Sequence, residues 1–390
     1  MSTSRIKLRG ITWNHSRGFL PMAATAQRFG ELHPEVEITW DKRSLRAFED
    51  QPVERLATNY DLIVLDHPAV SQGARHGALL PLDENLPAEF LLDQARNSVG
   101  ASHASYAFDG HHWALAIDAA TPVAFWREDL LAANGGRPPQ TWEQLLDLAR
   151  AGRVEVPAAP INCLMNFYSL CLAAGETPFT LADRVASRDV ALAAFLRLRE
   201  LLSHIEPGCW DRNPIASHDR VAGPGNTAIA YCPLAYGYSN YAREGYAAHR
   251  LAFGEPPLID GAPLRTTLGG AGLGVSAKTR HPEAALAYAQ FVASASVQRT
   301  VYTQNGGQPG HRAAWNDEEN NRQTGGYFAN TLPVLDRAYL RPHYPGYLKF
   351  QDHAGPVLHD ALRGVSPVDA ALDQIDLLYR HSRAGQAHAA

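Results

Sequence analysis

The sequence predicts an α/β fold built on a largely parallel sheet, and three observations lead to this prediction. Strand-like and helix-like patterns alternate over residues 6–65, which is the order that builds a parallel sheet. At 390 residues the chain is long enough for two domains, each with its own core. A glycine-rich stretch at residues 267–275 continues, after Pro282, into a helix. We therefore expect a two-domain α/β protein.

Composition and charge narrow the class of protein further. Hydrophobic residues make up 45 % and charged residues 19 % of the chain, as in ordinary globular proteins. The formal charge of -5 comes from 35 basic and 40 acidic residues without a basic run. Nucleic acid is therefore not an expected partner. The polar residues 1–5 lead directly into a strand pattern, with neither a signal segment nor a membrane span. We expect a cytoplasmic protein that is not membrane-inserted, or a periplasmic one if a leader was removed.

Neither a metal nor a cofactor is predicted. The chain has four cysteines without metal-like spacing, Cys163, Cys171, Cys209 and Cys232. In a protein of this size they are expected to be buried free thiols. His111 and His112 are neighbours in a strand pattern, so their side chains point to opposite faces. Gly269 and Gly274 have the outer spacing of a phosphate loop, but Val275 stands where that loop needs lysine. A nucleotide site is therefore not expected.

The first elements follow from hydrophobic periodicity. Residues 6–11 predict a strand, which leads through a loop at 13–18 into a helix over 19–29. Alternation over residues 36–40 predicts a half-buried strand, and the apolar run at 62–65 predicts a strand covered on both faces. Loops that follow parallel strands meet at one edge of the sheet, where such sheets bind ligands.

The middle of the chain shows turn and capping signals. Asp109 and Gly110 predict the turn of a hairpin. Residues 121–126 predict a strand, and Thr141 with Gln144 predicts the capped start of a helix.

The remaining elements are mainly helical. Residues 150–202 have a helical pattern, and a strand at 227–231 precedes an aromatic loop at 232–241. The polar stretch at 316–326 predicts a surface loop, and residues 367–379 predict a terminal helix.

Five segments match one family in order along nearly the whole chain. They are residues 77–83, 109–115, 126–131, 138–146 and 278–285. On these segments the chain resembles the extracellular solute-binding proteins of family 1, the sugar-type ligand-binding components of ABC importers. The resemblance implies periplasmic-binding-protein type II architecture, with two α/β lobes, a hinge and a ligand cleft on which the lobes close. An ABC permease is the implied partner if the protein is exported.

The same resemblance predicts where the chain passes between the lobes. The N-lobe is expected to comprise residues 1–118 plus 270–314, and the C-lobe residues 119–269 plus 315–390. The glycine-rich stretch would then be the point at which the chain re-enters the N-lobe and presents backbone amides to the ligand.

Candidate binding residues lie in loops after strands and in the glycine-rich stretch. The loop before the first helix offers amides and Arg17 to an anion or carboxylate. Asp66 can accept hydrogen bonds from ligand hydroxyls, and tyrosines can stack on a sugar face. Helix capping, strand-end capping and core packing remain open as alternatives for these residues. The predicted set is Trp13, Asn14, His15, Arg17, Asp66, His67, Asp118, Tyr231, Tyr236, Gly269, Gly270 and Gly272.

Two functions are compatible with this sequence. The first is a non-catalytic protein that closes on a small polar ligand, such as a sugar, a sugar acid or another organic acid. The second is a cytoplasmic enzyme or ligand sensor on the same fold, acting on a small organic acid or its thioester. No nucleophile motif is present. The catalytic candidates for the second function are His15, Asp66, His67 and Asp118.

Overall fold

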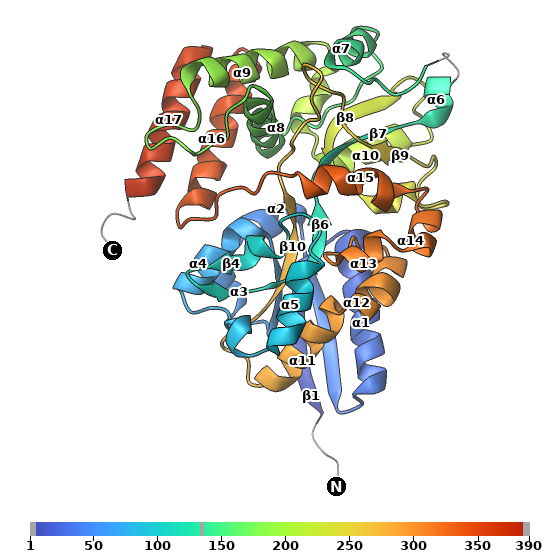
Figure 1. Cartoon of the computed structure of the whole chain (residues 1–390), viewed down its shortest axis with the longest axis vertical. Coiled ribbons are helices and arrows are strands. Elements are labelled where there is room, and N and C mark those ends of the chain that lie inside the picture. The colour runs from blue at the N-terminus through green and yellow to red at the C-terminus, as the bar shows by residue number, and fades with distance from the viewer. Residues whose placement is uncertain (1–4, 133–135, 385–390) are drawn as a thin grey trace. The chain divides into compact units, whose positions relative to one another are not determined.

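The computed structural model describes residues 5–132 and 136–384, except for the side chains of residues 46, 49 and 50. The chain divides into two compact units (Figure 1). Unit 1 comprises Met1–Ala120 and Leu268–Asp336, and unit 2 comprises Thr121–Thr267 and Arg337–Ala390. The first two crossings between units thus lie within two residues of the predicted positions.

The third crossing lies at residues 336 and 337, and not at 314 and 315 as predicted. Residues 315–336 belong to unit 1 because they pack into it. Trp315 is fully buried, and its ring centroid lies 5.0 Å from that of Phe328. The Asn320 side chain donates to the carbonyl oxygens of Arg299 and Ala314 at 3.0 and 3.1 Å. The predicted surface loop at 316–326 is also wrong, since Asp317 caps a short helix there.

Unit 1 is built on a five-stranded sheet. In spatial order its strands are β2 (Val36–Arg43), β1 (Ile6–Trp13), β3 (Leu62–Leu65), β10 (Gly269–Val275) and β6 (Leu115–Ala120). β1 is parallel to β2 and β3, whereas β10 is antiparallel to β3 and β6. The carboxyl ends of β1, β2, β3 and β6 therefore meet the amino end of β10 at one edge, which we call the carboxyl edge.

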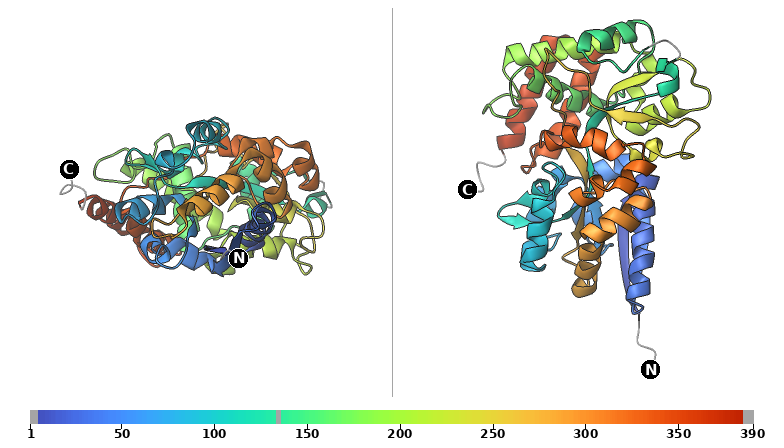
Figure 2. Two further views of the ribbon diagram at one scale, coloured as in Figure 1. Left: turned by 90° about the horizontal axis from the view of Figure 1, so that it is seen from below. Right: turned by 45° about the vertical axis from the view of Figure 1, so that its right-hand side comes forward.

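Helices cover the sheet of unit 1. α1 (Ser16–Leu32) and α11 (Pro282–Ala293) lie beside it in Figures 1 and 2, and the ring centroids of Phe29 and Tyr288 are 5.4 Å apart. The other helices of this unit are α2 (Leu45–Asp50), α3 (Val53–Leu56), α4 (Val70–Arg75), α5 (Ala88–Arg96), α12 (Ala295–Val297), α13 (Arg312–Trp315), α14 (Glu318–Gln323) and α15 (Tyr327–Asp336).

A hairpin in unit 1 confirms the predicted turn. β4 (Ala107–Phe108) pairs antiparallel with β5 (His111–His112). The two turn residues, Asp109 and Gly110, have φ angles of 52° and 80°. Positive φ at both central positions is the geometry that an Asp-Gly turn provides.

Unit 2 combines a small sheet with a helical core. Its antiparallel strands are β8 (Tyr231–Tyr236), β7 (Pro122–Trp126) and β9 (Ala252–Gly254). Its helices are α6 (Glu128–Ala132), α7 (Trp142–Arg150), α8 (Pro160–Ala173), α9 (Arg188–Ser203), α10 (Pro214–Ala222), α16 (Tyr347–Leu362) and α17 (Val368–Ala384). The strand predicted at 227–231 lies instead at 231–236, so it includes half of the predicted aromatic loop.

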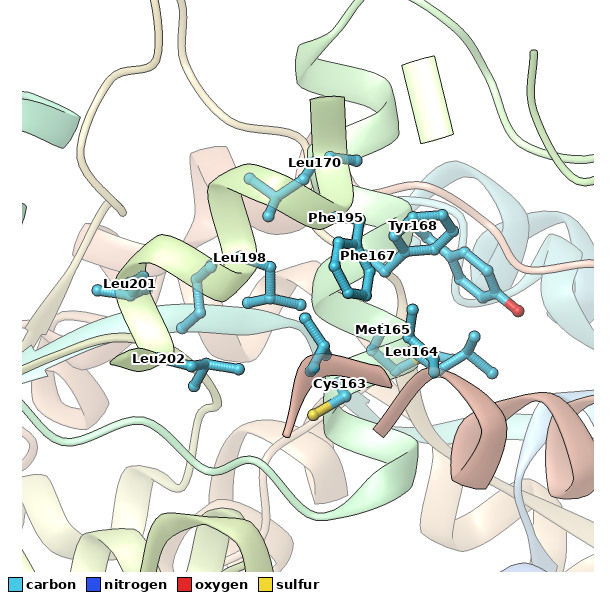
Figure 3. Close-up of a cluster of buried hydrophobic side chains, with 14 of the residues drawn as sticks. Cys163, Leu164, Met165, Phe167, Tyr168, Leu170, Phe195, Leu198, Leu201 and Leu202 are labelled. Atoms are coloured by element: carbon cyan, nitrogen blue, oxygen red, sulfur yellow. The ribbon is translucent and has the colours of Figure 1, made fainter. Parts of the chain in front are cut away.

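The core of unit 2 is apolar and closely packed. Figure 3 shows Phe167 and Leu170 of α8 with Phe195 and Leu198 of α9, all of them fully buried. Thr141 caps α7 as predicted and accepts from the amide of Gln144 at 3.3 Å. All four cysteines are buried free thiols, which confirms that prediction.

Candidate functional site

The carboxyl edge of unit 1 brings most of the predicted site residues together. β1 ends at Trp13, β3 is followed directly by Asp66, and Asp118 lies near the end of β6. The antiparallel strand β10 begins at this edge with Gly269. Sequence segments that lie far apart along the chain therefore converge, because β1, β3 and β6 end at the same edge at which β10 begins.

Arg17 and Asp118 form a buried ion pair at this edge. Arg17 lies in the first turn of α1, and its Nε donates to Oδ2 of Asp118 at 2.8 Å, while Nη2 donates to Oδ1. The Asp118 residue is 1 % exposed, and burial raises the pKa of its carboxyl although the charge of Arg17 opposes that shift. The guanidinium predicted to hold a ligand anion is thus already balanced by a carboxylate, and the pair presents no net charge.

His15 and Gly18 fix the geometry of the loop before α1. His15 is the N-cap of the helix, and its Nδ1 accepts from the amide of Arg17 at 3.0 Å. Burial, followed by the charge of Arg17, lowers the pKa of His15 to about 4, so the ring is neutral at pH 7. A Cβ on Gly18 would lie 2.3 Å from the ring of Trp13, so glycine lets this ring pack on α1. Asn14 is exposed, and its backbone N–H donates to the carbonyl of Arg43 at 2.7 Å.

Asp66 and His67 begin the turn after β3. Asp66 caps the 3₁₀ turn His67–Ala69 by accepting from the amide of His67 at 2.9 Å. Its side chain is 20 % exposed, whereas the His67 side chain is buried. Asp66 therefore serves as a strand-end cap, and part of its side chain is exposed at this edge.

The glycines of β10 allow close packing of the backbone. A Cβ on Gly270, which has φ of 121°, would lie 2.3 Å from the carbonyl oxygen of Asp118. A Cβ on Gly272 would lie 2.6 Å from the ring of Tyr106. Gly269 and Gly270 pair with β6 alone, because β3 has ended at Leu65. On the side that faces away from β6, this backbone segment does not pair with β3. Unpaired backbone on that side is what the predicted binding of a ligand by backbone amides requires.

The two candidate tyrosines of unit 2 have different environments. Tyr231 is 0 % exposed and belongs to the unit 2 core, with its ring centroid 6.3 Å from that of Trp126. The stacking role predicted for Tyr231 is therefore corrected to core packing. Tyr236 is half-buried, and its hydroxyl lies 2.9 Å from Oγ1 of Thr267. Tyr236 remains a candidate for contact with a ligand.

Sequence reasoning missed Arg43, the last residue of β2. Arg43 lies at the carboxyl edge, in register with Trp13 of β1, and is buried. The signal was present in the alternation over 36–40, because continuing that strand by three residues brings Arg43 to its end.

The catalytic candidates have structural roles at this edge. Asp118 pairs with Arg17, His15 and Asp66 cap helical turns, and His67 is buried beside Asp66. Across residues 5–132 and 136–384, no three His, Cys, Asp or Glu side chains are grouped as ligands for a metal ion. In the same described ranges, no helix is both long enough and apolar enough to span a bilayer.

Comparison with known families gives a match over most of the chain. The family model described as "bacterial extracellular solute-binding protein" matches residues 24–319.

Solved structures with the same fold support this match. Maltose-bound MalE3 of T. maritima superposes with a TM-score of 0.81 at 17 % identity, covering 95 % of this chain and 98 % of that one. The ABC transporter solute-binding protein of Agrobacterium radiobacter K84, in complex with ribitol, gives a TM-score of 0.82 at 16 % identity, with 96 % and 98 % coverage. The solute-binding protein of Thermotoga lettingae TMO, bound with α-D-tagatose, gives 0.79 at 16 % identity, with 96 % and 99 % coverage. The fold is therefore the two-lobed type II fold that the sequence predicted.

Proposed function

We propose that the chain, which belongs to the bacterial extracellular solute-binding proteins, binds a small hydroxyl-rich solute at the carboxyl edge of unit 1. Solute binding follows from the family, whereas the ligand class and the binding residues are our proposal. Three proteins of the same fold are described with maltose, ribitol and tagatose, all of which carry several hydroxyl groups.

The observation that carries this proposal is the set of polar groups fixed at the carboxyl edge. The Arg17–Asp118 pair is rigid because both side chains are buried and joined by two hydrogen bonds. Asp66 offers an acceptor beside it, and Asn14 offers an exposed amide side chain. Polar groups held by strand ends and a helix start bind a solute without first having to be ordered.

Part of the predicted set therefore enters the proposed site at the carboxyl edge. Asn14 and Asp66 would contact hydroxyl groups of the solute directly. The Arg17–Asp118 pair would orient these hydroxyl groups. Gly269 and Gly270 would supply backbone amides. Tyr231 is left out because its side chain belongs to the apolar core of unit 2.

Calorimetric titration with sugars, polyols and sugar acids tests the proposal. A solute at a hundred times its Kd is expected to stabilise the protein by about 2.7 kcal/mol, visible as a rise in Tm. Asp66→Asn removes one charge-assisted acceptor and is expected to weaken binding about tenfold. The absence of both saturable heat and thermal shift across the panel would contradict the proposal.

Lobe closure and the permease partner remain predictions from the family resemblance. Small-angle scattering with and without a bound solute measures closure as a decrease in the radius of gyration. An unchanged radius under saturating solute would contradict closure while leaving solute binding intact.

A further inference from the structure

Arg43 is a buried cation, and the partners that the structure describes for it are uncharged. It ends β2 at the carboxyl edge and is 8 % exposed. Its Nη2 donates to the carbonyl of Val64 at 3.0 Å, and its Nη1 donates to the carbonyl of Ala47 at 3.2 Å and to Oε1 of Gln51 at 3.4 Å. Among the side chains that the structure describes, no carboxylate forms an ion pair with Arg43. A buried guanidinium in such surroundings is unusual, because buried charges normally have a counter-charge.

Two buried donors in this region lack an acceptor. Nε of Arg43 and Nε1 of Trp13 have no hydrogen-bond partner among the described residues. The two residues face each other in the register of β1 and β2. Phe48 contacts both, with its ring centroid 5.2 Å from that of Trp13 and 5.2 Å from Cζ of Arg43. Each unsatisfied buried donor costs about 1–3 kcal/mol. The two N–H groups of Arg43 and Trp13 therefore indicate an acceptor that comes from a ligand.

The charge balance at the carboxyl edge also indicates that an acceptor is missing near Arg43. Arg17 is balanced by Asp118, so it adds no net positive charge. Burial lowers the pKa of Arg43 to about 10, which still leaves its guanidinium charged at neutral pH. Among the side chains described at this edge, Arg43 is therefore the buried cation without a carboxylate partner, and an anionic ligand group would balance it.

We propose that Arg43, with Trp13 beside it, binds the carboxylate of the solute, and that this solute is an acidic sugar or polyol. The inference rests on the proposed function and narrows its ligand class. A guanidinium Nε–H and an indole N–H together supply two donors for one carboxylate group, one of them charge-assisted. The contacts of Arg43 with Val64 and Ala47 hold α2 and β3, but they use neither of these two donors.

Matched pairs of probes test the inference on the full chain. Calorimetry compares glucose with glucuronate, galactose with galacturonate, and ribitol with ribonate. In each pair that binds, the acid is expected to have a Kd at least about tenfold lower than its neutral partner. Equal or tighter binding of the neutral partner would overturn the inference and leave the proposed function standing. Failure of the whole panel of sugars, polyols and sugar acids to bind would overturn both.

Variants then assign the preference to named side chains. Arg43→Met keeps the length of the side chain without its charge, and is expected to abolish the preference for the acid while changing the neutral Kd less than about twofold. Trp13→Phe removes the indole donor and is expected to weaken the acid about threefold or more. Lys42→Met is the matched control, because Lys42 is the exposed neighbour in β2 and contacts the Phe19 ring at 4.8 Å. This control should retain the full preference.

A purely structural Arg43 would give a different result. Arg43→Met would then lower Tm and weaken both members of each pair equally, which overturns the inference. If Arg43→Met fails to fold, Arg43→Lys provides the measurement, because it keeps the charge but lacks the planar fork. Arg43→Lys is expected to lose part of the preference for the acid, and full retention of the preference would count against the inference.

Discussion

Each unit contains a carboxylate that is 1 % exposed and paired with arginine, but the two pairs differ in their access to water. In unit 1, Asp118 is paired with Arg17, whose side chain is only 5 % exposed. In unit 2, Glu155 is paired with Arg212 and Arg220, whose side chains are 16 % and 37 % exposed. The unit 1 pair is enclosed on both sides, whereas the unit 2 carboxylate has partners that reach the surface.

The partners explain this difference. Arg212 and Arg220 also bind Glu206, and Ser217 of α10 donates to Glu155 at 2.9 Å. This network of hydrogen bonds and ion pairs holds α10 against the segment that contains Glu155. A structural role therefore accounts for the buried Glu155 carboxylate. An enclosed pair such as Arg17–Asp118 is often no more stable than apolar side chains of the same volume. Since stability alone does not explain the Arg17–Asp118 pair, its position at the carboxyl edge beside Asp66 favours a role in solute binding.

The largest expected effect follows from breaking the enclosed pair. Asp118→Ala leaves the Arg17 guanidinium buried without its counter-charge, and is expected to lower the free energy of unfolding by about 3–5 kcal/mol. Urea unfolding followed by circular dichroism measures the loss. Solute binding is expected to be lost as well, even under conditions in which the variant is folded.

The double variant Arg17→Met with Asp118→Leu separates stability from binding. It removes both charges, so most of the stability is expected to return while binding stays lost. Wild-type affinity in this double variant would show that the pair has no part in the site.

A second prediction tests the contact between β10 and β6, the strand that contains Asp118. Gly270→Val places a Cβ against the Asp118 carbonyl and puts a β-branched residue at φ of 121°. Overpacking and backbone strain are together expected to destabilise unit 1 by about 3 kcal/mol. Gly110→Ala is the control, since it adds strain at φ of 80° but has no atom within 4 Å of the new Cβ. Equal Tm changes for the two variants would mean that strain alone, and not the contact with β6, accounts for the effect.

The fold was predicted where local pattern decides the structure. The strand at 62–65, the turn at 109–110 and the cap at Thr141 all depend on residues close together in sequence, and each is observed. The third crossing was misplaced because the placement of 315–336 depends on burial of Trp315 against residues that periodicity does not identify. Polarity at 316–326 was interpreted as a loop, although Asp317 provides a helix cap there.

The site was predicted as a list of residues but not as a set of contacts. Strand ends identified Trp13 and Asp66, because the order of a parallel sheet places them at one edge. The pairing of Arg17 with Asp118 joins residues 101 positions apart, and no local signal reports it. The burial of Tyr231 also depends on packing that composition does not show. Sequence therefore located the edge, whereas the charge balance within it required the structure.

A third prediction extends the comparison to pH. His112 is buried in unit 1, with its ring centroid stacked 4.0 Å from that of His103. Burial, followed by the charge of His103, lowers the pKa of His112 to about 3, against an unfolded value near 6.5. The unfolded state therefore binds more protons between these values, and stability is lost as pH falls below about 6.5, by up to roughly 1.4 kcal/mol per pH unit.

His112→Phe is the variant that isolates this effect. Phenylalanine keeps a stacked ring but cannot take up a proton, so the slope of stability against pH should become shallower between about pH 6 and 4. Urea midpoints across this range, measured for both proteins, give the difference. Parallel pH profiles would show that His112 does not contribute to acid sensitivity.

The smallest effect is expected at the carboxylate of unit 2. Glu155→Gln keeps an acceptor for Arg212 and Ser217 but removes the charge, while both arginines retain access to water and to Glu206. The expected loss in the free energy of unfolding is about 1 kcal/mol, with solute affinity unchanged, because partly exposed ion pairs contribute little. Urea unfolding and calorimetry measure the two quantities on the same sample. A loss as large as that of Asp118→Ala would mean that the exposure of the arginines does not separate the two pairs. A loss of solute binding would place Glu155, too, among the residues that the site requires.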